Sequence, residues 1–152
     1  MGRVAAVHDV VGPLGAAERL WYDTARWPSF IDGFGHLVKV EGGWPAPGSR
    51  VVWDSTPAGR GRVVERVVEH RPAAGQVLEV EDASLRGTQR VRFEQRQDGT
   101  AVGLDLDYEL KQRGPLRALV DLLFIRRAIR DSLRRTLARF SRELSADLEL
   151  LP

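Results

Sequence analysis

Cysteine is absent from this sequence of 152 residues. Disulfides, thiolate nucleophiles, cysteine-ligated zinc and iron–sulfur clusters are therefore excluded. The only histidines, His8, His36 and His70, lie far apart and form no HExxH-type spacing, so we expect no dedicated metal site. The sequence also lacks a P-loop and a GxGxxG fingerprint, and we expect no cofactor.

Lysine is scarce, since Lys39 and Lys111 are the only two, and the other basic side chains are all arginine. A Schiff-base mechanism therefore has few candidates. The 23 basic and 21 acidic residues nearly balance, and 43% of the residues are hydrophobic, which is typical of one globular domain. No signal peptide or membrane span is recognisable. We expect a single cytoplasmic domain over residues 1–152.

The pattern of hydrophobic residues and of glycine and proline breaks predicts a strand over residues 4–11 and two helices, Pro13–Thr24 and residues 28–31. A helix without internal glycine or proline is predicted from Pro115 to about Leu148. Between the helices, short loops predict an antiparallel meander. Its six strands are Phe34–Glu41, Ser49–Thr56, Gly61–His70, Gln76–Asp82, Thr88–Gln97 and Thr100–Lys111.

The last hairpin can be predicted in register. A two-residue turn at Asp98-Gly99 would place Arg92 opposite Asp105 and Arg90 opposite Asp107. One face of the hairpin is then charge-paired and the other apolar, as in a sheet with one face in solvent. The acidic residues Asp105, Asp107 and Glu109 alternate along the second strand of this hairpin. We interpret them as a ladder of ion pairs rather than as a metal site.

The long helix carries one apolar stripe, which we expect to pack on the apolar face of the sheet. Its members, at helical spacing, are Leu119, Leu122, Leu123, Ile129, Leu133, Leu137, Phe140 and Leu144.

Two local segments resemble a known family. Leu20-Trp21 followed by Trp27-Pro28-Ser29-Phe30 is similar to the "VW…D…WP" segment of polyketide cyclase/dehydrase-type proteins, and Val67–Pro72 is also family-like. With the order of elements, the chain resembles the START-like helix-grip superfamily (SRPBCC, Bet v 1-like). The resemblance implies an α+β fold: a seven-stranded curved antiparallel sheet, two short helices and a long C-terminal helix, in the order β-α-α-β6-α.

The resemblance also implies a cavity between sheet and helix that takes a hydrophobic small molecule such as a lipid, a quinone or a polyketide. The alternative for each aromatic residue is that it only fills the core. Strand alternation, the helix stripe and the Trp-Pro segment supply the predicted ligand-binding residues. They are Trp27, Phe30, Phe34, Val51, Trp53, Gln89, Val91, Phe93, Leu104, Leu106, Tyr108, Leu119, Leu123, Arg126 and Arg130.

Arg126 and Arg130 fall within the apolar stripe of the long helix. A buried arginine needs a partner, because an unpaired buried charge is very costly. One hypothesis is that Arg126, or less favourably Arg130, binds an anionic group of a ligand in the cavity. The alternatives are an internal salt bridge to an acidic residue of the sheet and a side chain that reaches solvent at the cavity mouth.

Catalysis is left open by the sequence. Tyr108, Arg126 and His36 are the candidate acid–base groups for a cofactor-independent cyclase or dehydrase. Family cyclases typically place a tyrosine shortly after the Trp-Pro segment, whereas Phe34 stands at the corresponding position and has no hydroxyl. That departure disfavours cyclase chemistry but leaves ligand binding untouched.

Positive charge is concentrated on the long helix, where residues 115–148 contain eight arginines and four acidic residues. The outer face of this helix, with Arg117, Arg135, Arg139 and Arg142, either contacts an anionic membrane or RNA, as an interaction module would, or is simply solvated. We expect no DNA binding. The first turns are apolar almost all round, so a lid, the Trp21–Phe30 segment or a second subunit in a homodimer could cover them.

Overall fold

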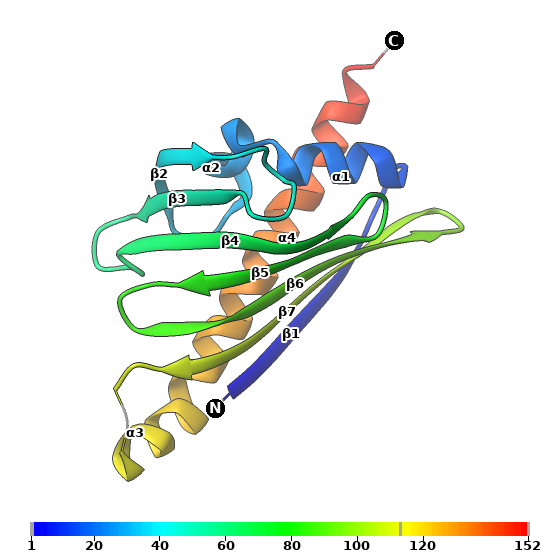
Figure 1. Ribbon diagram of the computed structural model, residues 1–152. Helices are drawn as coiled ribbons and strands as arrows, with labels where there is room; N and C mark the ends of the chain where they lie inside the picture. The colour runs from blue at the N-terminus through cyan, green and yellow to red at the C-terminus, as the bar shows by residue number, and fades with distance from the viewer. Residues whose placement is uncertain (1, 113, 152) are drawn as a thin grey trace.

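A computed structural model describes residues 2–112 and 114–151 of the chain (Figure 1). Over these residues the chain forms seven strands and a set of helical segments. In chain order they are β1 (Gly2–Val10), α1 (Leu14–Tyr22), η1 (Thr24–Arg26), α2 (Trp27–Phe30), β2 (Phe34–Glu41), β3 (Arg50–Ser55), β4 (Arg62–Arg71), β5 (Gly75–Glu81), β6 (Leu85–Arg96), β7 (Gly99–Leu110), α3 (Pro115–Val120), η2 (Asp121–Ile125) and α4 (Arg126–Glu149).

The strands form one antiparallel sheet in the order β1-β7-β6-β5-β4-β3-β2. The sheet is curved, and α4 runs diagonally across one of its faces, while α1 and α2 lie at one end of the same layer (Figure 1). The predicted helix-grip architecture is therefore confirmed. None of the helices among the described residues is long and apolar enough to cross a membrane.

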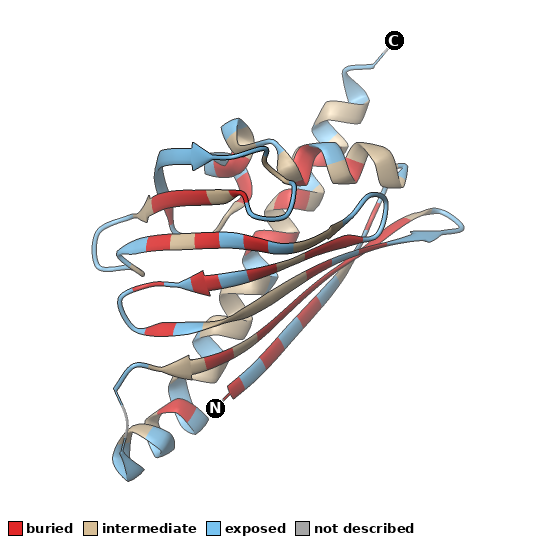
Figure 2. Ribbon diagram, viewed as in Figure 1, coloured by how far each residue is buried: buried red, intermediate tan, exposed pale blue. Residues whose placement is uncertain are grey.

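The core lies between the sheet and α4. Alternate side chains of β1, β4 and β5 are buried there, and Leu137, Phe140 and Leu144 of α4 are also buried (Figure 2). Two ionic clusters tie the short helices to α4. Asp32 accepts hydrogen bonds from Ser132, Arg135 and Arg139. Arg26 donates to Glu143 and Asp147.

The register of the β6–β7 hairpin differs from the prediction by two residues. Arg96 pairs with Gly99, so the turn residues are Gln97 and Asp98 rather than Asp98-Gly99. A shift of two residues keeps each side chain on its predicted face. The predicted ion pairs still form, diagonally, at 2.7 Å for Arg92–Asp105 and 3.0 Å for Arg90–Asp107.

The prediction of one continuous apolar stripe is wrong for the first turns of the long helix. The segment η2 is a π-helical turn. A π turn holds one more residue than an α turn, so the residues before it are rotated by about 100° relative to a continuous α-helix. Asp121 therefore faces inward and is buried, while Leu119, Leu122 and Leu123 are more than half exposed.

Candidate functional site

A small cavity lies between the sheet and α4, with a volume of about 60 Å³. Its lining includes Trp53, Glu65, Gln76 and Gln89 of the sheet and Thr136 of α4. Small-molecule sites usually have volumes of roughly 300–1,000 Å³. The closed interior therefore has room for only a few atoms of a ligand. A larger ligand can enter when the surrounding side chains move apart.

Glu65 is the carboxyl group of this interior. The alternation of β4 directs it inward between Val63 and Val67, and all three side chains are buried. The indole N–H of Trp53 donates a hydrogen bond of 2.7 Å to Glu65 Oε2. Burial raises the pKa of Glu65, while the Trp53 hydrogen bond and the charge of Arg60 lower it by less. The carboxyl is thereby shifted toward its neutral form, which can donate a proton or a hydrogen bond.

Two glutamines add amide groups to the same cavity. Gln76 of β5 and Gln89 of β6 both line it, and Gln76 is 4% exposed. The amide nitrogen Nε2 of Gln76 is buried and has no hydrogen-bond partner among the described residues. A buried donor without a partner is unfavourable. The interior thus offers a hydrogen-bond donor to any acceptor that enters it.

Arg60 closes the cavity at the loop between β3 and β4. Its guanidinium lies over the ring of Trp53, 5.6 Å from the ring centroid, and Nε donates to Asp82 Oδ2 at 2.7 Å. Burial alone would raise the pKa of Asp82. The charge and the hydrogen bond of Arg60, together with two backbone N–H groups, outweigh burial, so the pKa of Asp82 is lowered. This ion pair links the loop after β3 to the loop after β5.

Aromatic side chains fill the remaining interior. Trp53 stacks on Phe34 with ring centroids 5.0 Å apart, and Trp27 lies edge-on to Phe34 at 6.2 Å. Phe30 packs against Phe140 of α4 at 5.2 Å. The structure thus brings together four of the predicted ligand-binding residues, Trp27, Phe30, Phe34 and Trp53. In this closed form they pack within the same aromatic interior.

Most of the other predicted ligand-binding residues also face the interior. They are buried on the concave face of the sheet, except for Gln89, which is half-buried. This group contains Val51, Gln89, Val91, Phe93, Leu104 and Leu106.

Tyr108 and Arg126 meet at a different place, the end of the sheet beside η2. The Tyr108 hydroxyl donates to Asp121 Oδ1 at 2.6 Å, and the Arg126 guanidinium lies 3.7 Å from Asp121 Oδ2. Burial and the Asp121 hydrogen bond raise the pKa of Tyr108 to about 12, although Arg126 acts against them. Arg126 thus pairs with Asp121 of its own helix rather than with an acidic residue of the sheet, at a groove of about 530 Å³ also lined by Arg117 and Leu122.

The remaining candidates lie away from the interior. The imidazole of His36 is 70% exposed on β2, where Nε2 lies 3.3 Å from Asp54 Oδ2. Leu119 and Leu123 face outward because of the π turn, so their predicted place in the cavity is corrected. Arg130 is half-buried on α4 and does not line the interior cavity.

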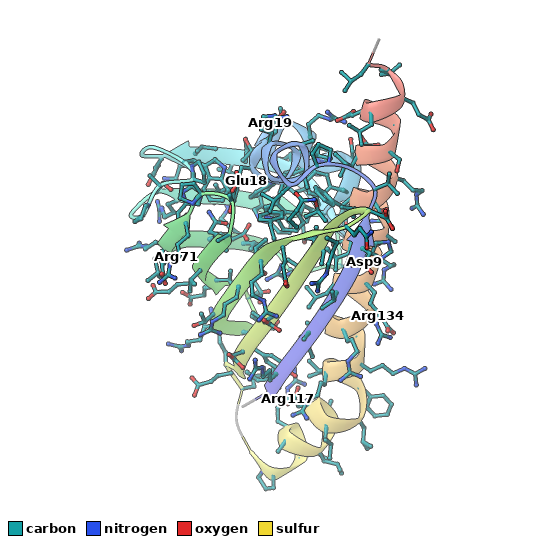
Figure 3. All side chains as sticks on the ribbon, turned by 90° about the vertical axis from the view of Figure 1, so that its right-hand side faces the viewer. Asp9, Glu18, Arg19, Arg71, Arg117 and Arg134 are labelled. Carbon is teal, nitrogen blue, oxygen red and sulfur yellow. The ribbon has the colours of Figure 1, made fainter. Side chains whose placement is uncertain are left out.

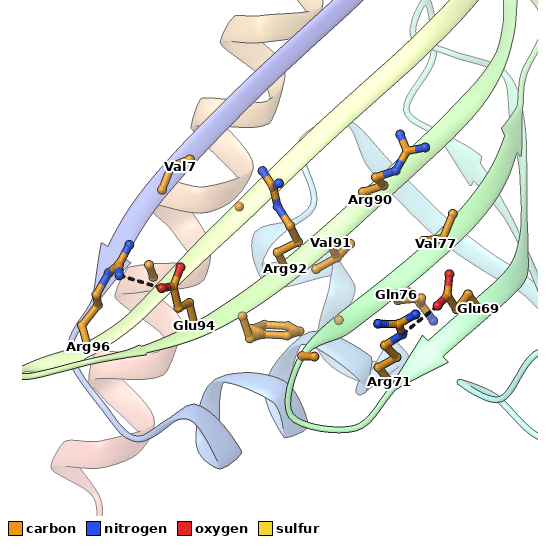
Figure 4. Close-up of a pocket in the computed structure, with 15 residues that line it drawn as sticks. Val7, Glu69, Arg71, Gln76, Val77, Arg90, Val91, Arg92, Glu94 and Arg96 are labelled. Atoms are coloured by element: carbon orange, nitrogen blue, oxygen red, sulfur yellow. Dashed lines mark hydrogen bonds and ion pairs between the residues drawn. The ribbon is translucent and has the colours of Figure 1, made fainter.

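A groove of about 680 Å³ lies on the sheet face that points away from α4 (Figure 4). Arginines surround it, and most of them are neutralised by neighbouring carboxylates. Arg71 pairs with Glu69 and Arg96 with Glu94. Both ion pairs are exposed to solvent, and in each pair the two charges neutralise each other. The groove is therefore a weaker candidate site than the interior.

The sequence did not single out Glu65, Gln76 or Arg60. Strand alternation alone could have placed Glu65 and Gln76 on inner faces, beside Val67 and Leu78. Two further polar atoms, Tyr22 Oη and His70 Nε2, are buried without a partner in the described part of the chain. No three metal-binding side chains of the described residues gather where one ion could bind them.

The chain matches a known protein family over most of its length. The model of a family described as "Polyketide cyclase / dehydrase and lipid transport" matches residues 1–145. No curated protein sequence matches the chain.

Solved structures share the fold. TTHA0849 from Thermus thermophilus superposes with a TM-score of 0.79 at 19% identity, covering 96% of this chain and 99% of that chain. A domain of StfQ, a di-domain ARO/CYC protein of the steffimycin biosynthetic pathway, gives 0.65 at 20% identity, over 95% of this chain and 49% of that chain. DynU16, from the dynemicin biosynthetic locus, gives 0.67 at 14% identity, over 94% of this chain and 47% of that chain. At these identities the likeness establishes the fold alone.

Proposed function

The chain belongs to the polyketide cyclase/dehydrase and lipid transport family, and from that premise we propose that it binds an apolar small molecule between the sheet and α4. The molecule is of the lipid, quinone or polyketide type and carries a carbonyl or hydroxyl oxygen. The observation that carries this proposal is a pair of buried polar groups inside an otherwise aromatic and aliphatic interior, the carboxyl of Glu65 and the amide nitrogen of Gln76, which has no hydrogen-bond partner among the described residues.

The polar groups suit an oxygen-bearing ring. A neutral Glu65 and the amide of Gln76 can each donate to a carbonyl oxygen. Trp53, Phe34 and Trp27 provide apolar ring faces around them. Because buried donors are costly when unpaired, a ligand that supplies acceptors gains affinity over a plain hydrocarbon.

Binding requires the interior to expand, since about 60 Å³ is available in the closed form. The Arg60–Asp82 ion pair bridges two loops at the rim of the cavity, and we propose that these loops part when ligand enters. The affinity measured for a ligand then includes the free energy of opening.

A second candidate function is acid catalysis in the same cavity. Glu65 supports it better than Tyr108, because burial raises the pKa of Glu65 and so favours the protonated carboxyl, the form that can act as an acid. The pKa of Tyr108, by contrast, is raised to about 12 by burial and by its bond to Asp121.

The test uses the full chain and menadione as a naphthoquinone probe in isothermal titration calorimetry, together with native mass spectrometry of the protein purified from cells. We expect saturable binding that Gln76→Leu weakens by about tenfold. Glu79→Gln, on the opposite face of β5, is the control and leaves binding unchanged. A co-purified apolar ligand supports the proposal; absence of both ligand and probe binding contradicts it.

Glu65→Gln separates binding from catalysis. The amide keeps a donor and an acceptor at the same place but has no acidic proton. If the protein only binds, the variant retains affinity. If it also catalyses cyclisation or dehydration of a poly-β-ketone mimic, the variant binds the mimic and loses turnover.

A further inference from the structure

Five large apolar side chains are exposed together at the start of the C-terminal helix. We call Leu116, Leu119, Leu122, Leu123 and Phe124 the apolar tip; their exposed fractions are 74%, 52%, 59%, 54% and 67%. The tip lies on α3 and η2, past the ends of β1 and β7 (Figures 1 and 2). Single exposed leucines are normal, but a contiguous group marks an interaction surface.

The fold holds these side chains outward. Asp121 takes the inward position in the π turn, where Tyr108 donates to it and Arg126 lies beside it. In a continuous α-helix Leu122 would face the sheet and Asp121 would not. The apolar tip is therefore presented by a specific buried interaction.

Positive charge lies within the apolar tip and along the helix that follows it. Arg117 lies within its span and Arg127, Arg130 and Arg134 follow it, and the ion pairs of the described residues include none of the four. Arg117 lies beside the end of β1, and Arg134 points away from the sheet (Figure 3). The acidic residue of the tip segment, Asp121, is buried. The tip is thus an apolar surface next to arginines that form no ion pair among the described residues, and Asp131 is the one acidic residue in sequence between Arg127 and Arg134.

We propose that the apolar tip docks onto the surface of an anionic lipid bilayer. The leucines and Phe124 enter the boundary between headgroups and acyl chains, and the arginines contact the lipid phosphates. Charge selects this partner over a second copy of the chain, since two tips in contact would bring the unpaired arginines of both copies together. Nucleic acid would match the charge but leave the leucines without an apolar partner.

The structure corrects the face that would make this contact. Arg135 and Arg139, which the sequence placed on the interacting face, are held by Asp32 at 3.1 Å each. The tip and its neighbouring arginines lie toward the start of the helix instead. This inference does not rest on the proposed ligand, because vesicle binding is measured without one.

The test is co-sedimentation of the full chain with phosphatidylcholine vesicles, with and without one-third phosphatidylglycerol. We expect binding only to the anionic vesicles, weakened by added salt. Leu122→Ser/Phe124→Ser reduces binding by at least about tenfold, and Arg127→Ala/Arg130→Ala reduces it as well. Matched controls are Leu150→Ser, 84% exposed at the far end of the helix, and Arg142→Ala, which leave binding unchanged.

Several outcomes would overturn the proposal. One is no binding to anionic vesicles; another is equal loss in the tip variants and the controls. A concentration-dependent dimer in light scattering that Leu122→Ser/Phe124→Ser abolishes would assign the tip to a second copy. Binding to single-stranded RNA without vesicle binding would assign the arginines to nucleic acid. All substituted side chains of the tip are exposed, so thermal unfolding should verify that each variant folds normally.

Discussion

The indole N–H of Trp53 donates to the buried carboxyl of Glu65 at 2.7 Å, on adjacent strands of the concave face. The carboxyl of Glu65 thus lies next to the aromatic ring of Trp53, and both side chains are buried in the core. Burial raises the pKa of this carboxyl. The pair therefore combines the apolar surface and the polar contact that the proposed ligand requires.

The protonation of Glu65 makes folding depend on pH. Its pKa is raised in the folded state, so the folded state holds the proton to higher pH than the unfolded state does. The free energy of unfolding then falls as pH rises from about 4, the ordinary pKa, through the folded-state pKa. We expect urea unfolding to show this decline in the native protein and a flatter profile in Glu65→Gln. Glu79→Gln, exposed on the outer face, should keep the native slope; a native slope in Glu65→Gln would contradict the assignment.

Two tyrosines provide a matched pair of substitutions. Tyr108 Oη donates to buried Asp121, whereas Tyr22 Oη is buried without a partner among the described residues. Tyr108→Phe leaves a carboxylate oxygen unpaired and should lower the free energy of unfolding by about 1–3 kcal/mol. Tyr22→Phe removes an unpaired hydroxyl and should be neutral or stabilising. Chemical unfolding measures both, and an equal loss in the two variants would contradict the role given to Asp121.

The face of each strand was predictable from the sequence, but the hairpin register was not. A shift of two residues preserves the inner and outer faces, so alternation cannot detect it. Gly99 suggested a turn residue, yet a Cβ at this position would overlap the carbonyl oxygen of Val10. The glycine is needed for the close approach of β1, which is a tertiary requirement that a local motif does not reveal.

The sequence predicted the aromatic residues of the candidate site and Gln89, but it did not predict Glu65, Gln76 or Arg60. Trp53 and Phe34 stand out in the sequence because large aromatic residues are few. Glu65 lies among the charged residues of β4 and resembles a solvent-facing glutamate until strand parity is fixed by Val63 and Val67. The partner of Arg126, Asp121, is turned inward by the π turn, for which the sequence shows no recognisable signal.

Asp32 should have the opposite pH dependence to Glu65. Burial raises its pKa, but hydrogen bonds from Arg135 and Ser132 and the charge of Arg139 outweigh that, so the net pKa is lowered. A lowered folded-state pKa adds stability above the ordinary value of about 4 and loses it as pH falls through the folded-state pKa. We expect Asp32→Asn to lower the free energy of unfolding at neutral pH by about 1–3 kcal/mol.

The control for Asp32 is Asp98→Asn, in the exposed turn between β6 and β7. It should change the free energy of unfolding by less than about 0.5 kcal/mol. The difference between the native protein and Asp32→Asn should shrink in acid, measured by urea unfolding at neutral pH and at a pH of about 3, below the ordinary pKa of aspartate. A difference that stays constant with pH would mean that the carboxylate charge of Asp32 does not tie the loop before β2 to α4.

Two leucines of the C-terminal helical segment, Leu137 and Leu122, should differ in how much a change to alanine lowers the free energy of unfolding. Leu137 is 1% exposed against the sheet, so Leu137→Ala removes buried methyl groups and leaves a cavity. We expect it to lower the free energy of unfolding by about 2–5 kcal/mol. Leu122 is 59% exposed beside the π turn, and Leu122→Ala should change it by less than about 0.5 kcal/mol. A large loss for Leu122→Ala would mean that the first turns pack on the sheet as a continuous α-helix, with Asp121 turned outward and the apolar tip buried.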